Sequence, residues 1–204
     1  DGREILSLGL FAATLLAVLI RPRNLPEGAS AALGAAVLLL TGGANLGDLG
    51  AVLRDNLTVY AFFLSMMTLT TLAEGAGVFE QLAGAAAWLA RGSPRRLFLN
   101  VIVLGTVIST FLTNDATALI LTPVVYTLVT GLNLDPLPYV FACTFIADTA
   151  SMTLPISNPI NIILGQRFAG LGLADSLHYL LLPSLAAISI NLAIFALIFR
   201  RKLV

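Results

Sequence analysis

The sequence has few charged residues and a single cysteine, and each shortage excludes a class of protein. Only 11% of its 204 residues are Asp, Glu, Lys or Arg, whereas soluble domains carry roughly 25%. The 11 basic and 11 acidic residues balance, so no basic surface for nucleic acid is expected. One cysteine, Cys143, supports neither an intramolecular disulfide nor a thiolate metal cage. Without metal-ligand spacings or nucleotide-binding motifs, the sequence predicts no cofactor and no metal.

What the chain has instead is apolar residues, which make up 58% of it and give a mean hydropathy of +0.95. This composition predicts a multi-pass protein in the lipid bilayer of the cell (inner) membrane. Apolar runs predict membrane spans at 5–20, 28–40 and 57–73. Residues 77–90 are less hydrophobic, contain Glu80 and Gln81, and predict an amphipathic helix that lies at the membrane surface or packs on the bundle. Residues 1–93 are therefore predicted to be scaffold helices, three spans plus a surface helix.

Residues 94–170 contain two polar interruptions and are predicted to be the transport region. The apolar runs 97–112 and 116–129 flank a polar tip at 113–117. Two short arms around a polar tip predict a re-entrant helical hairpin rather than two full spans. The next apolar segment is interrupted at 155–159, where a proline stands at each end. Proline removes backbone hydrogen bonds, so this segment is predicted to be a broken transmembrane helix.

Residues 171–204 complete the predicted all-α, integral membrane fold with a second surface helix at 173–182 and a last span at 183–199, which begins at a proline. Basic residues follow three of the predicted spans or helices, at 21–23, 91–96 and 200–202. Because cytoplasmic loops carry an excess of Lys and Arg, these three clusters are expected on the cytoplasmic side. That topology places the N-terminus outside.

Two aspartates, Asp115 and Asp148, lie within apolar sequence. An acidic residue in hydrocarbon is costly and commonly marks the path of an ion, a proton or a substrate. Either Asn114 or Asp115 is also well placed to cap the helix that follows, and capping does not exclude a transport role. For Asp148, a structural role near the interface is an equal alternative to a functional one.

The second interruption contains Ser157, Asn158, Pro159 and Asn161. Its structural interpretation is a proline kink at which asparagine side chains bind free backbone groups. Its functional interpretation depends on the hairpin tip, because secondary transporters build binding sites from discontinuous helices that meet near the midplane of the bilayer.

Three segments, 114–123, 145–151 and 157–162, resemble the arsenite efflux permease family of the ion transporter superfamily. That family is built from two inverted repeats, each with a re-entrant hairpin and a broken helix. This chain is similar to the first repeat only. The resemblance therefore implies half of a transporter, which needs a second half from a missing repeat or from a partner chain.

The same resemblance implies a secondary active transporter and not an enzyme. Its expected activity is the export of arsenite or antimonite, as the neutral hydroxide, in exchange for protons, which confers arsenic resistance. An arsenite-stimulated cytoplasmic ATPase is a further partner that the resemblance allows. The residues implied to bind the substrate are Asn114, Thr117, Ser157, Asn158 and Asn161, and those implied to couple protons are Asp115 and Asp148.

Other functions remain open at this stage. A sodium/proton antiporter of the same superfamily would use Asp115 and the carbonyls of the broken helix to hold sodium. A dicarboxylate carrier would need more donors at each tip. A non-transporting membrane subunit or an intramembrane aspartyl protease ranks lower, since the glycine-rich aspartate motif of such proteases is missing.

Overall fold

The computed structural model describes residues 2–167 and 172–203. These residues form helices joined by short loops, and no strand occurs among them, so the predicted all-α fold is confirmed. Contacts divide the chain into two units, Asp1–Leu57 and Thr58–Val204, and each unit is described by itself below.

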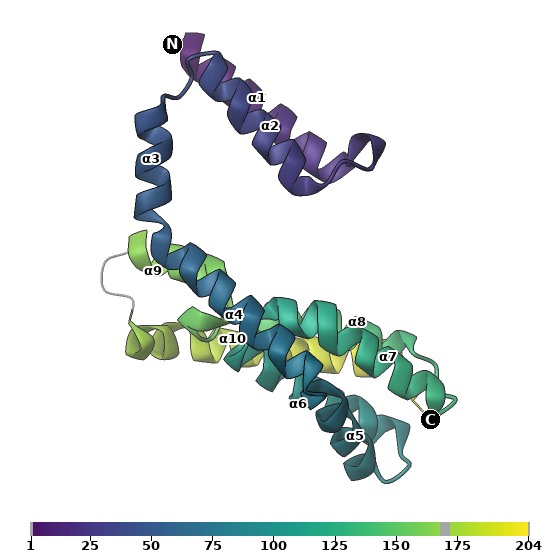
Figure 1. Cartoon of the computed structure of the whole chain (residues 1–204). Coiled ribbons are helices and arrows are strands. Elements are labelled where there is room, and N and C mark those ends of the chain that lie inside the picture. The colour runs from purple at the N-terminus through teal and green to yellow at the C-terminus, as the bar shows by residue number, and fades with distance from the viewer. Residues whose placement is uncertain (1, 168–171, 204) are drawn as a thin grey trace. The chain divides into compact units, whose positions relative to one another are not determined.

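The first unit is built around a helical pair. Helix α1 (Gly2–Ile20) packs against α2 (Glu27–Leu40), and the short helix η1 (Pro22–Asn24) lies in the connection between them (Figure 1). Gly34 makes their close approach feasible, because a Cβ atom at that position would overlap the Thr14 hydroxyl.

Helix α3 (Leu46–Asp55) completes the first unit and begins at a capping box. The Asp48 amide donates to the Asn45 side-chain oxygen over 2.9 Å, and the Asn45 amide donates to the Asp48 carboxylate over 2.8 Å. These two bonds satisfy backbone donors that the first turn of a helix leaves free, which explains why the helix starts at this point.

The second unit begins with α4 (Leu57–Gly75), followed by α5 (Val78–Ala90) and α6 (Pro94–Phe111). By length and composition, α4 and α6 can each cross a membrane. Helix α5 packs along α6, where the Asn100 amide donates to the Ala86 carbonyl over 2.8 Å. The helix predicted at 77–90 is thus present.

Two helical arms lie where the hairpin was predicted, and their re-entrance stays a prediction. The second arm consists of the π-helix η2 (Ala116–Leu121) and α7 (Thr122–Gly131), both packed against the neighbouring helices of this unit. The first arm, α6, is longer than the apolar run predicted, because the helix already starts at Pro94. Its 18 residues rise by about 27 Å, close to the thickness of the hydrocarbon core.

The predicted broken helix consists of α8 (Leu137–Ala150), the short helix η3 (Pro155–Ser157) and α9 (Pro159–Arg167). Helix α8 packs most extensively on α6. Gly105 allows this contact, because a Cβ atom there would lie only 3.3 Å from the nearest side-chain carbon, Cγ2 of Ile146.

Helix α10 (Leu173–Ile198) runs without interruption through Pro183. The segment predicted as a separate surface helix and the segment predicted as the last span are therefore one helix of 26 residues, long enough to cross a membrane. Residues 168–171 of the predicted segments lie outside the described residues. Helix α10 packs against α8, with the Phe195 ring 5.0 Å from the Phe145 ring in an edge-to-face arrangement.

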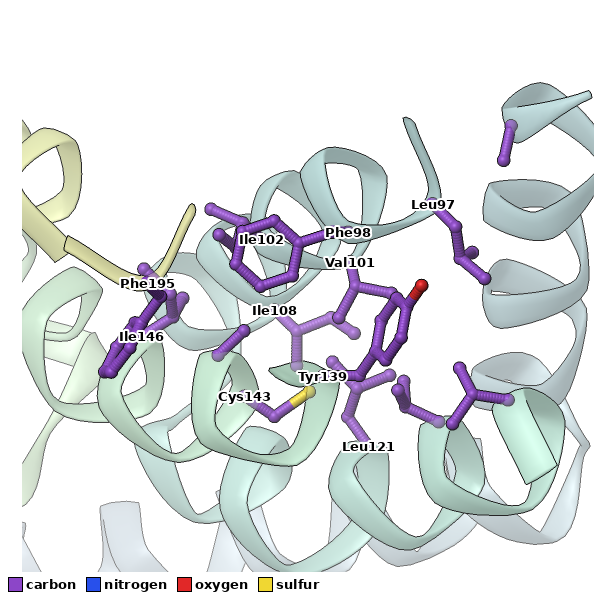
Figure 2. Packing of buried hydrophobic residues seen from close by; sticks show 14 of the residues in the cluster. Leu97, Phe98, Val101, Ile102, Ile108, Leu121, Tyr139, Cys143, Ile146 and Phe195 are labelled. Carbon is purple, nitrogen blue, oxygen red and sulfur yellow. The ribbon is translucent and has the colours of Figure 1, made fainter. Parts of the chain in front are cut away.

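The core of the second unit lies between α5, α6, the second hairpin arm, α8 and α10. Val101, Leu121, Tyr139 and Ile146 have no exposed surface, and Cys143 is 1% exposed. Figure 2 shows these side chains converging from the packed helices. The hairpin and the broken helix thus share one core, which fixes their two interruptions with respect to each other.

One end of this unit carries two of the three basic clusters. The Tyr139 hydroxyl near the start of α8 donates to the Pro94 carbonyl at the start of α6 over 3.1 Å. Lys202 lies 2.7 Å from Asp135 in the loop before α8. The clusters at 91–96 and 200–202 therefore share an end, as the predicted topology requires of those two.

Candidate functional site

The hairpin tip forms where the backbone leaves the helical path after α6. Leu112 has φ −100° and ψ −99°, and its amide still donates to the Ile108 carbonyl. The Ala116 amide then donates to the Thr113 hydroxyl over 3.2 Å. The residue that caps the second arm is thus Thr113, and the expected cap at Asn114 or Asp115 is wrong. Asp115 already has a right-handed helical backbone, so its side chain is not the capping group.

The second arm starts as a π-helix, in which backbone hydrogen bonds span five residues instead of four. Both the amide and the hydroxyl of Thr122 donate to the Thr117 carbonyl, the hydroxyl over 3.0 Å. Pro123 follows and has no amide hydrogen to give to the carbonyl four residues earlier. Short π-helical segments are frequent at functional sites, and this one directly follows the tip.

A cavity of about 190 Å³ lies between the hairpin tip and α4. Asp115 and Thr113 line it from the tip, and Thr70 and Thr71 line it from α4. Its apolar walls come from Phe62, Phe63, Met66, Met67, Leu119 and Ile120. A space lined mainly by apolar side chains with a few convergent polar groups is the usual form of a small-molecule site.

Two polar atoms at this end of the unit are buried without a partner in the described part of the chain. They are Oγ1 of Thr70, which lines the cavity, and Oδ1 of Asn114 beside it in the tip. Leaving a buried polar group unpaired costs about 1–3 kcal/mol. Unpaired groups of this kind are rare in folded proteins, and each needs an explanation, such as backbone strain, a functional role or a bound water or ion.

The second interruption is held by side chains bonded to backbone. The Asn161 amide nitrogen donates to the carbonyls of Ser151 and Leu154, over 2.8 Å in each case. The Asn158 side-chain oxygen accepts from the Ile160 amide over 3.0 Å and so caps α9. These bonds replace those that the prolines remove, which is the structural interpretation of the two asparagines. Their predicted substrate contacts stay a prediction.

The two interruptions meet at Thr110, near the end of α6. The Ser157 hydroxyl donates to the Thr110 carbonyl over 2.5 Å, and the Thr110 hydroxyl donates to the Ala150 carbonyl over 3.3 Å. Ser157 has no exposed surface. The structure therefore brings the break of the second segment against the last turn before the hairpin tip. The bonds that join them use Thr110 rather than Asn114.

Thr117 and Asp148, two further predicted site residues, lie in opposite environments. Thr117 is fully buried between α6 and η2, where its hydroxyl accepts from Ser109 over 2.7 Å and donates to the Gly105 carbonyl over 3.5 Å. Asp148 is exposed on α8. Asp115, by contrast, is partly buried and lines the cavity. The structure thus separates the two aspartates by environment.

A hydroxyl network joins the second interruption to α10. Thr153 donates to the Ser184 hydroxyl over 2.7 Å, and Ser184 donates to the Thr149 carbonyl over 3.0 Å. The Asn191 amide donates to the Thr149 hydroxyl over 3.2 Å. Ser184 has no exposed surface, so this network fixes the end of α8 against α10 from inside the packed unit.

A second, wider cavity of about 410 Å³ lies next to the first, and Ile120 lines both. Two acidic residues, Glu74 and Glu80, line it together with Pro123 and Thr127 of α7. In the described part of the chain, no group of three or more His, Cys, Asp or Glu residues is arranged to hold a metal ion. The acidic pair thus lines a cavity that lies along α7, beyond the residues of the tip.

The opposite end of the unit, far along α6 from the tip, holds an exposed ion pair. A hydrogen bond from Lys202 and one from the Leu137 amide together lower the pKa of the Asp135 carboxyl below its usual value. The pair is on the surface, where solvent screens it. It ties the segment after α10 to the loop before α8 and has no part in the cavity.

Thr70 and Thr71 were not among the site residues predicted from the sequence. The available signal was a run of hydroxyl side chains, Thr68, Thr70 and Thr71, in an apolar segment that has no charge before Glu74. Threonine in such a helix commonly bonds its own backbone. Only the packing of α4 near the tip distinguishes Thr70 from its neighbours.

Comparison with known proteins places the chain in a family. A family model described as citrate transporter (CitMHS) matches residues 14–204. The arsenical pump membrane proteins of Escherichia coli (strain K12) and Yersinia enterocolitica are each 33% identical over 202 residues, covering 98% of this chain and 47% of the relative. An uncharacterized transporter of Synechocystis is 29% identical over 162 residues, covering 79% of this chain and 36% of the relative. No solved structure matches the chain.

The chain spans about half the length of the curated relatives it matches. The similarity to arsenical pump membrane proteins extends over almost the whole chain, which confirms the resemblance found in the sequence. Together with the apolar helices, it makes the chain part of a multi-pass integral membrane protein, and the bacterial relatives support the inner membrane as its location. The chain belongs to the citrate transporter (CitMHS) family of membrane transporters.

Proposed function

We propose that this chain is half of a secondary active transporter that exports arsenite, and antimonite, as the neutral hydroxide in exchange for protons. The observation that carries the proposal is the position of Asp115. It lies at the break between the two hairpin arms and lines a cavity whose walls are mainly apolar. An acidic group in such surroundings commonly moves a proton or an ion in membrane proteins.

The described ion pairs leave Asp115 available for this role. They join Arg21 to Glu27 and Lys202 to Asp135, and neither involves Asp115. A carboxyl group is charged in one protonation state and neutral in the other. Proton uptake and release by Asp115 therefore changes the polarity of the cavity, which gives a physical basis for exchanging a proton against cargo.

The chemistry of the cavity favours a neutral hydroxide over an anion. Its polar end presents one carboxylate and threonine hydroxyls, and no Lys or Arg is among the described residues that line it. A citrate or dicarboxylate ion would meet the negative charge of Asp115 without a compensating cation. Arsenious acid is largely uncharged at neutral pH and offers hydroxyl groups that both donate and accept hydrogen bonds.

The second half of the transporter, from another part of the same protein or from a partner chain, completes the site in this proposal. The relatives are about twice as long as this chain, and secondary transporters commonly combine two inverted repeats around one central site. An arsenite-stimulated cytoplasmic ATPase is a further partner consistent with the names of the relatives, which are arsenical pump proteins.

The test uses the full-length transporter that contains this chain, in everted membrane vesicles. An imposed proton gradient should drive arsenite uptake by the wild type. Asp115→Asn keeps the size of the side chain but removes its titratable proton, so it should reduce gradient-driven uptake to the level of empty vesicles. Asp55→Asn makes the same change at an exposed position in α3 and should transport like the wild type.

Each alternative has its own result in this assay. Arsenite-independent exchange of sodium for protons would favour the sodium/proton antiporter. Citrate uptake that arsenite does not inhibit would favour a carboxylate carrier, and the name of the matching family model makes this comparison necessary. Full proton-driven arsenite uptake by Asp115→Asn would remove Asp115 from the mechanism.

A further inference from the structure

Thr70 lies near the end of α4 and lines the same cavity as Asp115. Its side chain is 7% exposed, and Oγ1 has no hydrogen-bond partner in the described part of the chain. A hydroxyl carries one donor and two acceptor positions. The donor and both acceptor positions of the Thr70 hydroxyl are therefore unused, and the oxygen is buried from solvent.

The neighbouring hydroxyls of α4 behave differently. Ser65, Thr68 and Thr71 each donate to the carbonyl four residues earlier, over 2.8 Å in every case. This is the ordinary solution for a hydroxyl in an apolar helix, and it satisfies the donor without help from another element. Thr70 does not make this bond, so its hydroxyl stays free to bind a group inside the cavity.

Two groups on the hairpin tip face the same space as Thr70. Thr113 is 6% exposed and accepts a hydrogen bond from the Ala116 amide, which leaves its own hydroxyl hydrogen available. Asp115, two residues further along the tip, contributes a carboxylate. Two hydroxyls and one carboxylate thus converge from two helices that are separated by more than 40 positions in the sequence.

We propose that Thr70 is a cargo-binding residue, whose hydroxyl bonds a small, uncharged polyhydroxy acid held between α4 and Asp115. This inference rests on the proposed function and adds α4 to the site. A cargo with several hydroxyls can donate to Asp115 and bond both threonines at once. The apolar walls of the cavity then exclude ions that would need a full hydration shell.

The mechanism makes an unusual prediction about stability. Thr70→Val has nearly the same shape but removes the unpaired buried hydroxyl, so without cargo the variant should be at least as stable as the wild type. Arsenite stabilises a protein that binds it only when folded. The same concentration of arsenite should therefore raise the melting temperature of Thr70→Val less than that of the wild type.

The transport test measures KM and maximal rate for arsenite in vesicles that contain the full-length transporter. Thr70→Val should raise KM by about two- to tenfold, the equivalent of one lost hydrogen bond, with little change in maximal rate or in response to the proton gradient. Thr70→Ser keeps the hydroxyl and should retain most of the affinity. Thr68→Val is the matched control, since that hydroxyl bonds Leu64 and does not line the cavity.

If the wild type exports arsenite and Thr70→Val has the same KM as Thr68→Val, the role of Thr70 is overturned. A raised KM that Thr70→Ser shares, together with lower stability of both variants without cargo, would also overturn it, because packing would then explain the effect. Absence of arsenite transport by the wild type would instead contradict the proposed function itself.

Discussion

The two asparagines of the second interruption offer a matched pair of identical substitutions with opposite expected results. Asn161 donates its amide hydrogens to the carbonyls of Ser151 and Leu154. Asn158 uses its side-chain oxygen to accept from the Ile160 amide. Asn→Asp replaces an amide nitrogen by an oxygen and changes little in size. It therefore removes the function of Asn161 while it preserves that of Asn158.

The expected magnitude follows from the bonds that are lost. Asn161→Asp removes two hydrogen bonds and leaves two carbonyls facing an oxygen, at a cost of about 2–4 kcal/mol in the free energy of unfolding. Each kcal/mol shifts the melting temperature by about 2–4 °C in a domain of about 150–250 residues and by less in a longer protein, so the expected decrease in the full-length transporter is at most about 16 °C. Asn158→Asp should stay within about 0.5 kcal/mol of the wild type, since a negative charge suits the first turn of a helix.

Thermal unfolding of the purified transporter in detergent measures both effects, and arsenite uptake in vesicles shows their consequence. If Asn161 only holds the break, Asn161→Asp should lose transport in proportion to the loss of folded protein. A fully stable Asn161→Asp variant would refute the role given to its two bonds. Destabilisation of Asn158→Asp by as much as Asn161→Asp would refute the distinction between donor and acceptor on which the comparison rests.

Two further predictions concern buried and exposed polar pairs. Thr117→Val removes the hydroxyl bonded to Ser109 and should lower the free energy of unfolding by about 0.5–1.5 kcal/mol. Its KM for arsenite should not change, because Thr117 has no exposed surface; a raised KM at unchanged stability would contradict this. Asp135→Asn should remove a stabilisation of less than about 1 kcal/mol, because the Asp135–Lys202 pair is exposed. The pKa of Asp135 is lower in the folded state, so this stabilisation exists above the ordinary pKa of Asp, about 3.9, and disappears as the pH falls through the folded value. Melting temperatures of the variant and the wild type should therefore differ at neutral pH and converge as the pH falls through the lowered pKa of Asp135 in the folded state.

The hairpin and the broken helix were predictable because they depend on local chemistry. A polar run between apolar arms, at 113–117, interrupts the burial that a membrane helix requires. Prolines at 155 and 159 remove backbone donors wherever they occur. Both the polar run and the prolines predict an interruption of the helix without any information about which residues pack against it. The same rule failed at Pro183, where the helix continues through the proline, as neighbouring packing in membrane proteins allows.

The roles of single side chains were less predictable, because they depend on which atoms face which helix. Thr113, Asn114 and Asp115 are all able to cap a helix, and only the backbone turn at Leu112 selects Thr113. Asn161 can act as donor or acceptor, and the free carbonyls at the end of α8 decide that it donates. Thr70 is one of several threonines in α4, and its free hydroxyl emerges only from the packed structure.

The polar residues of this unit therefore divide by what they bind. Some have protein partners: Ser157 and Asn161, for example, donate hydrogen bonds to backbone carbonyls and so hold the two interruptions in place. Two residues that line or adjoin the cavity, Thr70 and Asn114, have buried atoms without partners, whereas Thr71 and Thr113, which also line it, each make a hydrogen bond within the protein. A transporter has to bind and release its cargo, and groups already bonded to backbone must first break those bonds to do so. The contacts to cargo in this half are thus expected at the hairpin tip and α4, with the broken helix as their support.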